Sequence, residues 1–155
     1  MLETENKAPL CALLNQDNKM IDLMTINKNI VLYFYPKDDT PGCTLEGKEF
    51  SQLHDDFLNF DTVIFGVSKD STGSHQKFKE KHCFNFDLLA DTDLVLTKSF
   101  DAWGEKSMFG VKYMGIQRKT FFINKEKIIS KIWPKVTAKN HANEVLNFVK
   151  SFSTL

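Results

Sequence analysis

The chain has 155 residues, of which 42% are hydrophobic and 26% charged, a composition typical of one globular domain over residues 1–155. Its 20 basic and 20 acidic residues cancel, so no net field favours nucleic acid or an anionic membrane as a partner. The acidic, polar N-terminus is unlike a secretory signal, and the apolar runs are too short to span a bilayer. Three cysteines without a Cys-x-x-Cys pair indicate a reducing compartment, and we expect a cytoplasmic location.

Short apolar stretches near the N-terminus predict a β-hairpin. Leu10–Leu14 and Met20–Leu23 are separated by the polar run Asn15–Lys19, which is typical of a turn. We expect these two strands to lie at a sheet edge. The continuous β-branched and aromatic run Ile30–Tyr35 predicts a strand that is buried on both faces.

A helix predicted over Pro41–Leu58 begins at the residues with the strongest functional signal. Thr40 is a favourable N-cap, and Pro41 suits the first helical position because its missing N–H would have no partner there. Cys43 then lies in the first turn, where unpaired N–H groups and the helix dipole favour a thiolate. Phe50 follows Cys43 by two helical turns, so we expect the thiol to face the core.

The helix terminus alone stabilises a thiolate too weakly for a fast nucleophile. A free cysteine has a pKa near ~8.5, and each unit of depression needs ~1.4 kcal/mol. A helix dipole supplies ~0.3–1 kcal/mol, or up to ~2 kcal/mol when partly buried. A nearby cation is therefore expected to contribute as well. Without one, Cys43 would be a small hydrophobic residue at a helix start, the usual role of a lone cysteine.

The remaining chain alternates between strand and helix patterns. The predicted strands are Val63–Val67 and Phe86–Ala90, and the predicted helices are Ser71–His82, Leu94–Phe100 and His141–Phe152. Lys119–Asn124 and Ile128–Trp133 predict a hairpin. Trp103–Lys106 is expected to form a loop. Its tryptophan and Tyr113 either line the entrance of a pocket or pack in the core, which is the commoner role of aromatic residues. The alternation predicts an α/β fold in which helices flank a mixed central sheet.

Several blocks of sequence carry a resemblance that spans nearly the whole chain: AP at 8–9, YFYPKDDTPGCT at 33–44, FDLLAD at 86–91, WGEK at 103–106, GIQR at 115–118, and HA and EVL at 141–142 and 144–146. With these blocks the chain resembles the peroxiredoxins, in particular the bacterioferritin comigratory protein or Q-type subgroup. The resemblance implies a thioredoxin-like fold, a common monomeric state, and reduction of hydrogen peroxide and organic hydroperoxides to water and alcohols through a cysteine sulfenic acid. No cofactor is expected.

The resemblance also implies a set of site residues. Cys43 matches the peroxidatic cysteine, and Thr40 matches the threonine whose hydroxyl contacts thiolate and peroxide. Pro36 matches the proline that shields the thiol. Arg118 matches the active-site arginine and would supply the missing cation from the start of the strand at 119–124. The alternative for Arg118 is an ordinary surface arginine.

The means of regenerating the thiol is open. Many Q-type members carry a resolving cysteine five residues after the peroxidatic one, where this chain has Lys48. Cys83 lies about one helical turn from the alternative position of that cysteine, and is either a buried helix-end residue or a resolving thiol that acts after local unfolding. Cys11, in an apolar strand, is most simply a core residue. If neither serves, an external thiol such as thioredoxin, glutathione or glutaredoxin must reduce Cys43.

Other polar residues give weaker signals. Glu46 and Lys48 are expected on a solvated helix face, and the histidines lack zinc-type spacing with cysteine, so no metal is expected. Two competing functions remain: a thiol–disulfide oxidoreductase and a redox-responsive chaperone or binding module on the same fold. The first is disfavoured because no second cysteine follows Cys43 by three residues.

Overall fold

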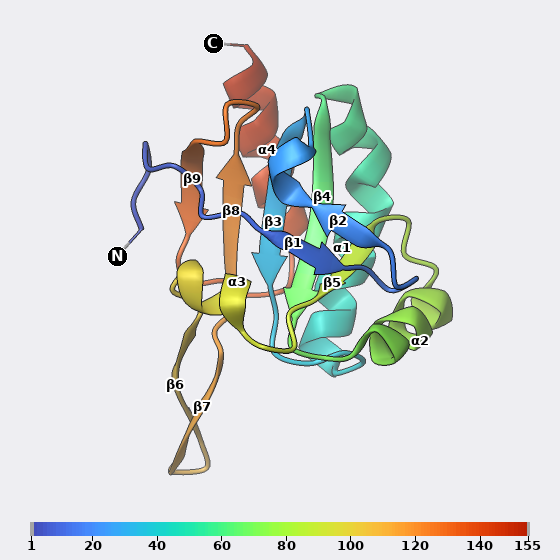
Figure 1. Ribbon diagram of the computed structural model, residues 1–155, viewed down its shortest axis with the longest axis vertical. Helices are drawn as coiled ribbons and strands as arrows, with labels where there is room; N and C mark the ends of the chain where they lie inside the picture. The colour runs from blue at the N-terminus through green and yellow to red at the C-terminus, as the bar shows by residue number, and fades with distance from the viewer. Residues whose placement is uncertain (1, 155) are drawn as a thin grey trace.

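The computed structural model describes residues 2–154, and its centre is a mixed sheet with strand order β5-β4-β3-β8-β9 (Figure 1). The strands are β3 (Asn29–Phe34), β4 (Thr62–Ser68), β5 (Asp87–Ala90), β8 (Lys119–Ile123) and β9 (Ile129–Trp133). β3, β4 and β5 are parallel, whereas β8 and β9 are each antiparallel to their neighbours. The predicted strands and the predicted mixed α/β architecture are confirmed.

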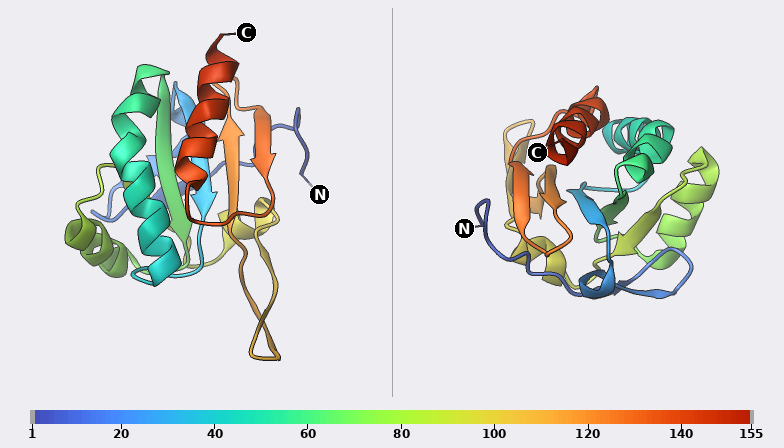
Figure 2. Two further views of the ribbon diagram at one scale, coloured as in Figure 1. Left: turned by 180° about the vertical axis from the view of Figure 1, so that it is seen from behind. Right: turned by 90° about the horizontal axis from the view of Figure 1, so that it is seen from above.

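Helices and short segments cover the two faces of this sheet. α1 (Pro41–Asn59) and α4 (His141–Ser153) lie on one face, and α2 (Thr72–His82) lies beside β5 (Figure 2). The other face is covered by α3 (Val95–Ser99) and the 3-10 helix η1 (Leu23–Thr25). Within residues 2–154, no helix combines the length and the apolar character needed to cross a membrane.

β3 is buried along its whole length because both of its faces are covered. Its side chains alternate between two cores, as the pleat requires. Val31 and Tyr33 belong to the core beneath α1 and α4, and Leu32 and Phe34 belong to the core on the opposite face. The continuous hydrophobic run in the sequence therefore corresponds to one strand that lies between two hydrophobic cores.

The N-terminal hairpin forms as predicted, with β1 (Ala12–Leu14) antiparallel to β2 (Met20–Asp22). It does not extend the central sheet as an edge. The two strands make a separate small sheet, which touches β5 through a bridge between Asn15 and Leu89. The side chains of Asn15 and Gln16 both donate to the carboxylate of Asp87, so polar turn residues hold the hairpin in place.

A second hairpin, β6 (Trp103–Met108) and β7 (Val111–Ile116), projects from the body of the molecule (Figure 1). The expected loop over Trp103–Lys106 is therefore wrong. The turn consists of Phe109 and Gly110, whose φ values of 52° and 79° are those of a two-residue hairpin turn. Phenylalanine is unusual in that position, so the sequence lacked the usual Asn-Gly signal.

The aromatic residues of this second hairpin differ in burial. Trp103 is half-buried and packs against the core on the α3 face of the sheet, as expected. Tyr113 is 41% exposed, so its expected core packing is wrong. The reason is that β7 extends beyond the sheet, where no second layer covers it (Figure 1).

Candidate active site

Cys43 lies at the junction where β3 leads into α1. The loop between them spans residues 35–40, and α1 begins at Pro41 after Thr40 as the N-cap. Cys43 is 2% exposed and belongs to the core beneath α1, so the prediction that its thiol faces inward is confirmed. A thiol in the first turn of a 19-residue helix lies in the field of the helix dipole.

Arg118 brings a cation to this thiol. Phe34, the last residue of β3, pairs with Lys119 at the start of β8, so Arg118 lies beside the end of β3 where the loop to Cys43 begins. Its Nη2 donates a hydrogen bond to Cys43 Sγ at 3.4 Å. A Cβ atom added at Gly42 would lie 3.1 Å from that Nη2, so glycine lets the guanidinium approach the helix closely. The surface-arginine alternative is excluded by this geometry.

Glu46 completes the cluster and was missed by the sequence reading. The expected solvated position is wrong, because Glu46 is fully buried and its Oε1 accepts a hydrogen bond from Arg118 Nη1 at 2.7 Å. Glu46 lies one turn after Cys43 on the inward stripe of α1 that also contains Phe50. The signal in the sequence was its spacing of three residues from Cys43, which places both side chains on the same face of the helix. Lys48 is exposed, as expected.

Burial of the Glu46 carboxyl disfavours its charged form. Burial raises its pKa to about 7, against the opposing effect of the Arg118 guanidinium. Its second oxygen, Oε2, has no hydrogen-bond partner within the described residues. Near neutral pH the carboxyl therefore exchanges between a form that pairs with Arg118 as an ion and a form that is neutral.

His141, at the start of α4, lies behind this cluster. It is 4% exposed and is packed edge-on against the rings of Phe50 and Trp133. Its Nε2 forms a 2.8 Å hydrogen bond with Thr120 Oγ1. Burial, followed by the charge of Arg118, lowers the pKa of His141 to about 4, so the imidazole is neutral near neutral pH.

Thr40 and Pro36 lie in the 35–40 loop that leads into α1. Thr40 takes the predicted N-cap position with extended backbone angles, but its side chain makes no cap hydrogen bond. Its hydroxyl instead donates to the carbonyl of Lys37 at 2.8 Å, which leaves the oxygen able to accept. Pro36 directly follows Tyr35, the last buried residue of the strand region, and is half-buried.

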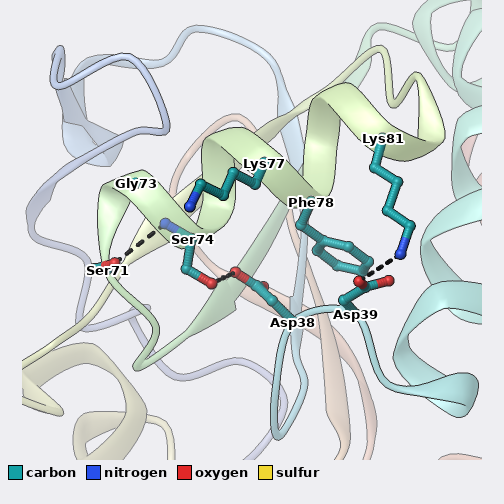
Figure 3. A pocket seen from close by; sticks show the side chains of 8 residues that line it. All are labelled: Asp38, Asp39, Ser71, Gly73, Ser74, Lys77, Phe78 and Lys81. Atoms are coloured by element: carbon teal, nitrogen blue, oxygen red, sulfur yellow. Dashed lines mark hydrogen bonds and ion pairs between the residues drawn. The ribbon is translucent and has the colours of Figure 1, made fainter.

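Acidic residues of the same loop tie it to α2, as Figure 3 shows. Asp38 is buried and accepts from Ser74 Oγ at 2.8 Å, and His75 Nδ1 lies 2.7 Å from the same carboxylate oxygen. Asp39 pairs with Lys81 at 2.8 Å and with His82 at 3.0 Å. Both ends of α2 thus hold the loop that leads to Cys43.

Asp38, Asp70 and His75 are close enough to be considered as metal ligands. Their donor atoms are already occupied by protein partners. Asp38 Oδ1 accepts from Tyr35, Asp70 Oδ2 accepts from the backbone N–H of Asp38, and His75 Nε2 donates to the carbonyl of Leu89. The hydrogen bonds of these three side chains therefore explain their grouping, because they anchor the 35–40 loop.

The other two cysteines lie in different surroundings, and all three are free thiols. Cys83 is exposed and caps α2 with a left-handed φ of 55°, so the buried helix-end interpretation is wrong. Its neighbour Phe84 packs against Gly47 of α1, one turn beyond Cys43. Cys11 is half-buried and packs against the core on the α3 face, and burial raises the pKa of its thiol.

Comparison with known proteins agrees with this geometry. The AhpC/TSA family model matches residues 4–132. The chain is 46% identical over 153 residues to peroxiredoxin Bcp of Bacillus subtilis, covering 98% of each. A peroxiredoxin Q variant from Xylella fastidiosa superposes with a TM-score of 0.93 and 37% identity, covering 99% of this chain and 98% of that one.

A bacterioferritin comigratory protein of Xanthomonas campestris, described for its alkyl peroxide reduction activity, superposes with a TM-score of 0.87 and 38% identity over 92% of this chain and 91% of that one. The neighbours share the thioredoxin-like fold that the sequence predicts. The chain therefore belongs to the AhpC/TSA family, as a thiol peroxidase of the peroxiredoxins related to Bcp.

Proposed function

We propose that Cys43 is the peroxidatic nucleophile, which reduces hydrogen peroxide and organic hydroperoxides to water and alcohols. The observation that carries this proposal is the 3.4 Å hydrogen bond from Arg118 Nη2 to Cys43 Sγ, made to a buried thiol in the first turn of α1. A guanidinium remains charged at any working pH, so it stabilises the thiolate continuously. The helix dipole and the guanidinium both favour negative charge on the Cys43 sulfur.

In the proposed reaction, the Cys43 thiolate attacks the terminal oxygen of the peroxide. An S–O bond forms and the O–O bond breaks, so sulfur is oxidised to sulfenic acid and the peroxide is reduced. The departing oxygen carries negative charge, which Arg118 and the backbone N–H groups at the start of α1 stabilise until it takes up a proton and leaves as alcohol or water. Hydrogen-bond donors fixed before the reaction need no reorganisation as this charge develops.

Thr40 and Pro36 are proposed to shape the substrate position. Because the Thr40 hydroxyl gives its own proton to the carbonyl of Lys37, its oxygen can accept the O–H of a bound peroxide. That bond would orient the peroxide toward Cys43. Pro36 offers no N–H and would shield the thiolate from water on the strand side.

Regeneration requires a thiol reductant, for which we propose thioredoxin or a glutathione–glutaredoxin pair. A thiol attacks the sulfenic acid sulfur, water leaves, and a second thiol releases the resulting disulfide. The exposed position of Cys83 supports it as an internal first thiol. Three unpaired cysteines support action in a reducing compartment, which we propose is the cytoplasm.

We also propose that the protein acts as a monomer, in line with its Q-type resemblance. Met108 and Phe109, at the tip of the β6–β7 hairpin, are exposed in the single chain. Light scattering at micromolar concentration checks this. A mass of two chains would contradict the monomer.

One assay tests the proposed nucleophile. Peroxide consumption is followed with a thioredoxin couple and, separately, with glutathione, for the wild type and for Cys43→Ser. We expect consumption by the wild type and background rates for the variant. Insulin disulfide reduction with peroxide untouched would indicate a thiol–disulfide oxidoreductase, and neither activity would indicate a binding role.

A further inference from the structure

The exposed apolar side chains of this protein are concentrated on the β6–β7 hairpin. Within residues 2–154, eleven large hydrophobic side chains are exposed, and five of them lie between positions 108 and 114. These five are Met108, Phe109, Val111, Tyr113 and Met114. A contiguous apolar surface on a monomer marks a site of interaction with a protein or a membrane. The reaction proposed at Cys43 uses none of these side chains.

Phe109, at the tip of the hairpin, contributes no burial to the fold. Its side chain is 98% exposed, and its left-handed φ of 52° is one that a bulky residue rarely adopts. A Cβ atom added at the neighbouring Gly110 would meet no atom within 4 Å in the described part of the chain, so the turn stands clear of the body (Figure 1). A strained backbone that carries an unburied aromatic ring points to a role outside the fold.

The register of the hairpin arranges its side chains in order of distance from the tip. Met108 pairs with Val111 directly behind the turn, and Ser107 pairs with Lys112 one step further. Lys112 lies about 7 Å behind the turn, since a strand rises about 3.4 Å per residue. The next pair contains Tyr113. An apolar tip, a lysine about 5–10 Å behind it and then a tyrosine are the order found in segments that enter the headgroup region of a bilayer.

The charge around the hairpin favours an anionic surface, although the whole chain is neutral. Residues 103–119 contain four cationic side chains and one acidic one. The acidic residue is Glu105, whose Oε1 lies 3.6 Å from Lys112 Nζ, and both side chains are largely exposed. An exposed ion pair of this kind contributes little stability, so Lys112 can exchange Glu105 for a lipid phosphate. The cytoplasmic leaflet of a membrane carries the matching negative charge.

A bilayer fits this tip better than a second copy of the chain does. A stable dimer buries about 800 Å² on each partner, whereas one large side chain offers at most about 150–250 Å². Met108, Phe109 and Val111 together therefore present less surface than a dimer needs. The hairpin also projects as a narrow finger (Figure 2), and a fluid bilayer closes around such a shape without a complementary surface.

We propose that the tip of the β6–β7 hairpin is a membrane anchor, which inserts Met108, Phe109 and Val111 into an anionic lipid surface while Lys112 binds the headgroup phosphates. This inference names a partner and is independent of the chemistry at Cys43. Arg118 lies two residues after the end of β7, so binding would bring the site around the thiol close to the membrane surface.

The test measures cosedimentation with vesicles of phosphatidylcholine, alone or mixed equally with phosphatidylglycerol, at low salt. We expect the wild type to bind the mixed vesicles, and Phe109→Ser to bind them about tenfold more weakly, because a large aromatic surface then no longer leaves water. Met108→Ser should weaken binding as well.

Met24→Ser is the matched control for Met108→Ser. Met24 is 52% exposed and Met108 is 56% exposed, so the same surface is removed in both variants. Met24 lies in η1, which precedes β3, whereas the hairpin leads into β8 beside the other end of β3. Met24→Ser should therefore bind the mixed vesicles as tightly as the wild type.

Two charge variants test the electrostatic part. Lys112→Gln should bind the mixed vesicles about fivefold more weakly, since each cation near an anionic surface contributes to binding. Glu105→Gln should bind them severalfold more tightly, because it removes the acidic side chain from the hairpin. A damaged fold would not produce that gain. Both effects should vanish on phosphatidylcholine alone and shrink at high salt.

Phe109→Trp places a reporter at the tip. After subtraction of the wild-type emission from Trp103 and Trp133, the fluorescence of the new indole should shift to shorter wavelength on addition of mixed vesicles. Brominated lipids should then quench it. Binding without either change would show adsorption to the surface rather than insertion, and would overturn the anchor.

Absence of binding by the wild type, or equal binding by the wild type and Phe109→Ser, would also overturn the anchor. A mass of two chains in the absence of vesicles, restored to one chain by Phe109→Ser, would assign the tip to a second copy instead. Peroxide consumption is measured without vesicles, so a failure at Cys43 and a failure of the anchor are separate results.

Discussion

Arg118 Nη1 donates to Oε1 of Glu46 at 2.7 Å, while Nη2 of the same guanidinium donates to Cys43 Sγ. Because the guanidinium is planar, fixing one amino group fixes the direction of the other. Glu46 is therefore a positioning residue that acts on the thiol through Arg118. It lies in the helix turn after Cys43, so one helix supplies both partners of the arginine.

Arg118→Ala should slow the oxidation of Cys43. Removing a donor that stabilises developing negative charge costs about 10²–10³-fold in rate. The same variant should also lower the fraction of Cys43 present as thiolate at neutral pH, which thiolate absorbance and the rate of alkylation both measure. Stopped flow with hydrogen peroxide gives the rate constant.

Arg118→Lys is the matched control for charge without geometry. Lysine keeps the positive charge but cannot bind Glu46 and Cys43 with one rigid group, so its rate should lie between wild type and Arg118→Ala. A rate for Arg118→Ala equal to that of the wild type would remove the electrostatic role of this residue.

Glu46 and His141 should give the folded protein opposite pH dependences that offset one another. The raised pKa of Glu46, about 7, means that the folded state holds a proton that the unfolded state has lost, so stability falls as the pH rises through 4.5 to 7. The lowered pKa of His141, about 4, has the reverse effect, so its contribution is lost as the pH falls from 6.5 to 4. Each effect changes the free energy of unfolding by about 3 kcal/mol across its pH range.

Single variants should separate the two. In Glu46→Gln only the histidine effect remains, so the free energy of unfolding should drop more steeply toward acid than in wild type. In His141→Gln only the carboxyl effect remains, so it should drop toward neutral pH. Urea denaturation at a series of pH values measures both effects. If the free energy of unfolding varied with pH in the same way in all three proteins, the proposed roles of Glu46 and His141 would be contradicted.

His75→Ala should loosen the loop that leads to Cys43. The substitution removes the buried contacts of His75 with Asp38 and with the Leu89 carbonyl, although Asp38 keeps its hydrogen bonds from Tyr35 and Ser74, and it should cost about 2–5 kcal/mol of unfolding free energy. Ser74→Ala removes one hydrogen bond to the same carboxylate and should cost about 1 kcal/mol. Thermal and urea denaturation check both, and an equal cost for the two variants would show that Asp38 is not the anchor.

Cys83 should form a disulfide with Cys43 when peroxide is added without reductant. A disulfide needs Cα atoms within about 7 Å. Cys43 is buried whereas Cys83 is exposed at the end of α2, so we expect that end to release Asp39 from Lys81 and His82 before the thiols meet. Mass spectrometry of digested wild type should show the linked peptides, and Cys83→Ser should trap Cys43 as sulfenic acid. The same trapped species in both proteins would mean that an external thiol acts directly.

Local patterns predicted most of the fold. The strand at β3 and the helix at α1 agree with prediction because burial on both faces and the Thr-Pro start act through neighbouring residues. The β6–β7 hairpin was missed because its strands are stabilised by pairing with one another and its turn carries phenylalanine. Backbone pairing leaves no pattern of its own in side-chain hydrophobicity.

The cluster around the thiol was predictable only in part. Cys43 and Arg118 stand in motifs, and antiparallel pairing of Phe34 with Lys119 brings them together. Glu46 has no such motif, since a carboxylate on a helix is usually solvated. It is buried because Arg118, distant in sequence, comes to lie over its position. That dependence on a long-range contact is what a local pattern does not contain.

The most direct test of the central claim is to locate the first oxidation. Reduced protein is treated with one equivalent of hydrogen peroxide in the presence of a sulfenic-acid-trapping reagent such as dimedone, and the modified peptide is sequenced by mass spectrometry. We predict that the adduct lies on Cys43 and is absent from Cys11 and Cys83. An adduct on either of those residues, with Cys43 still reduced, would contradict the account.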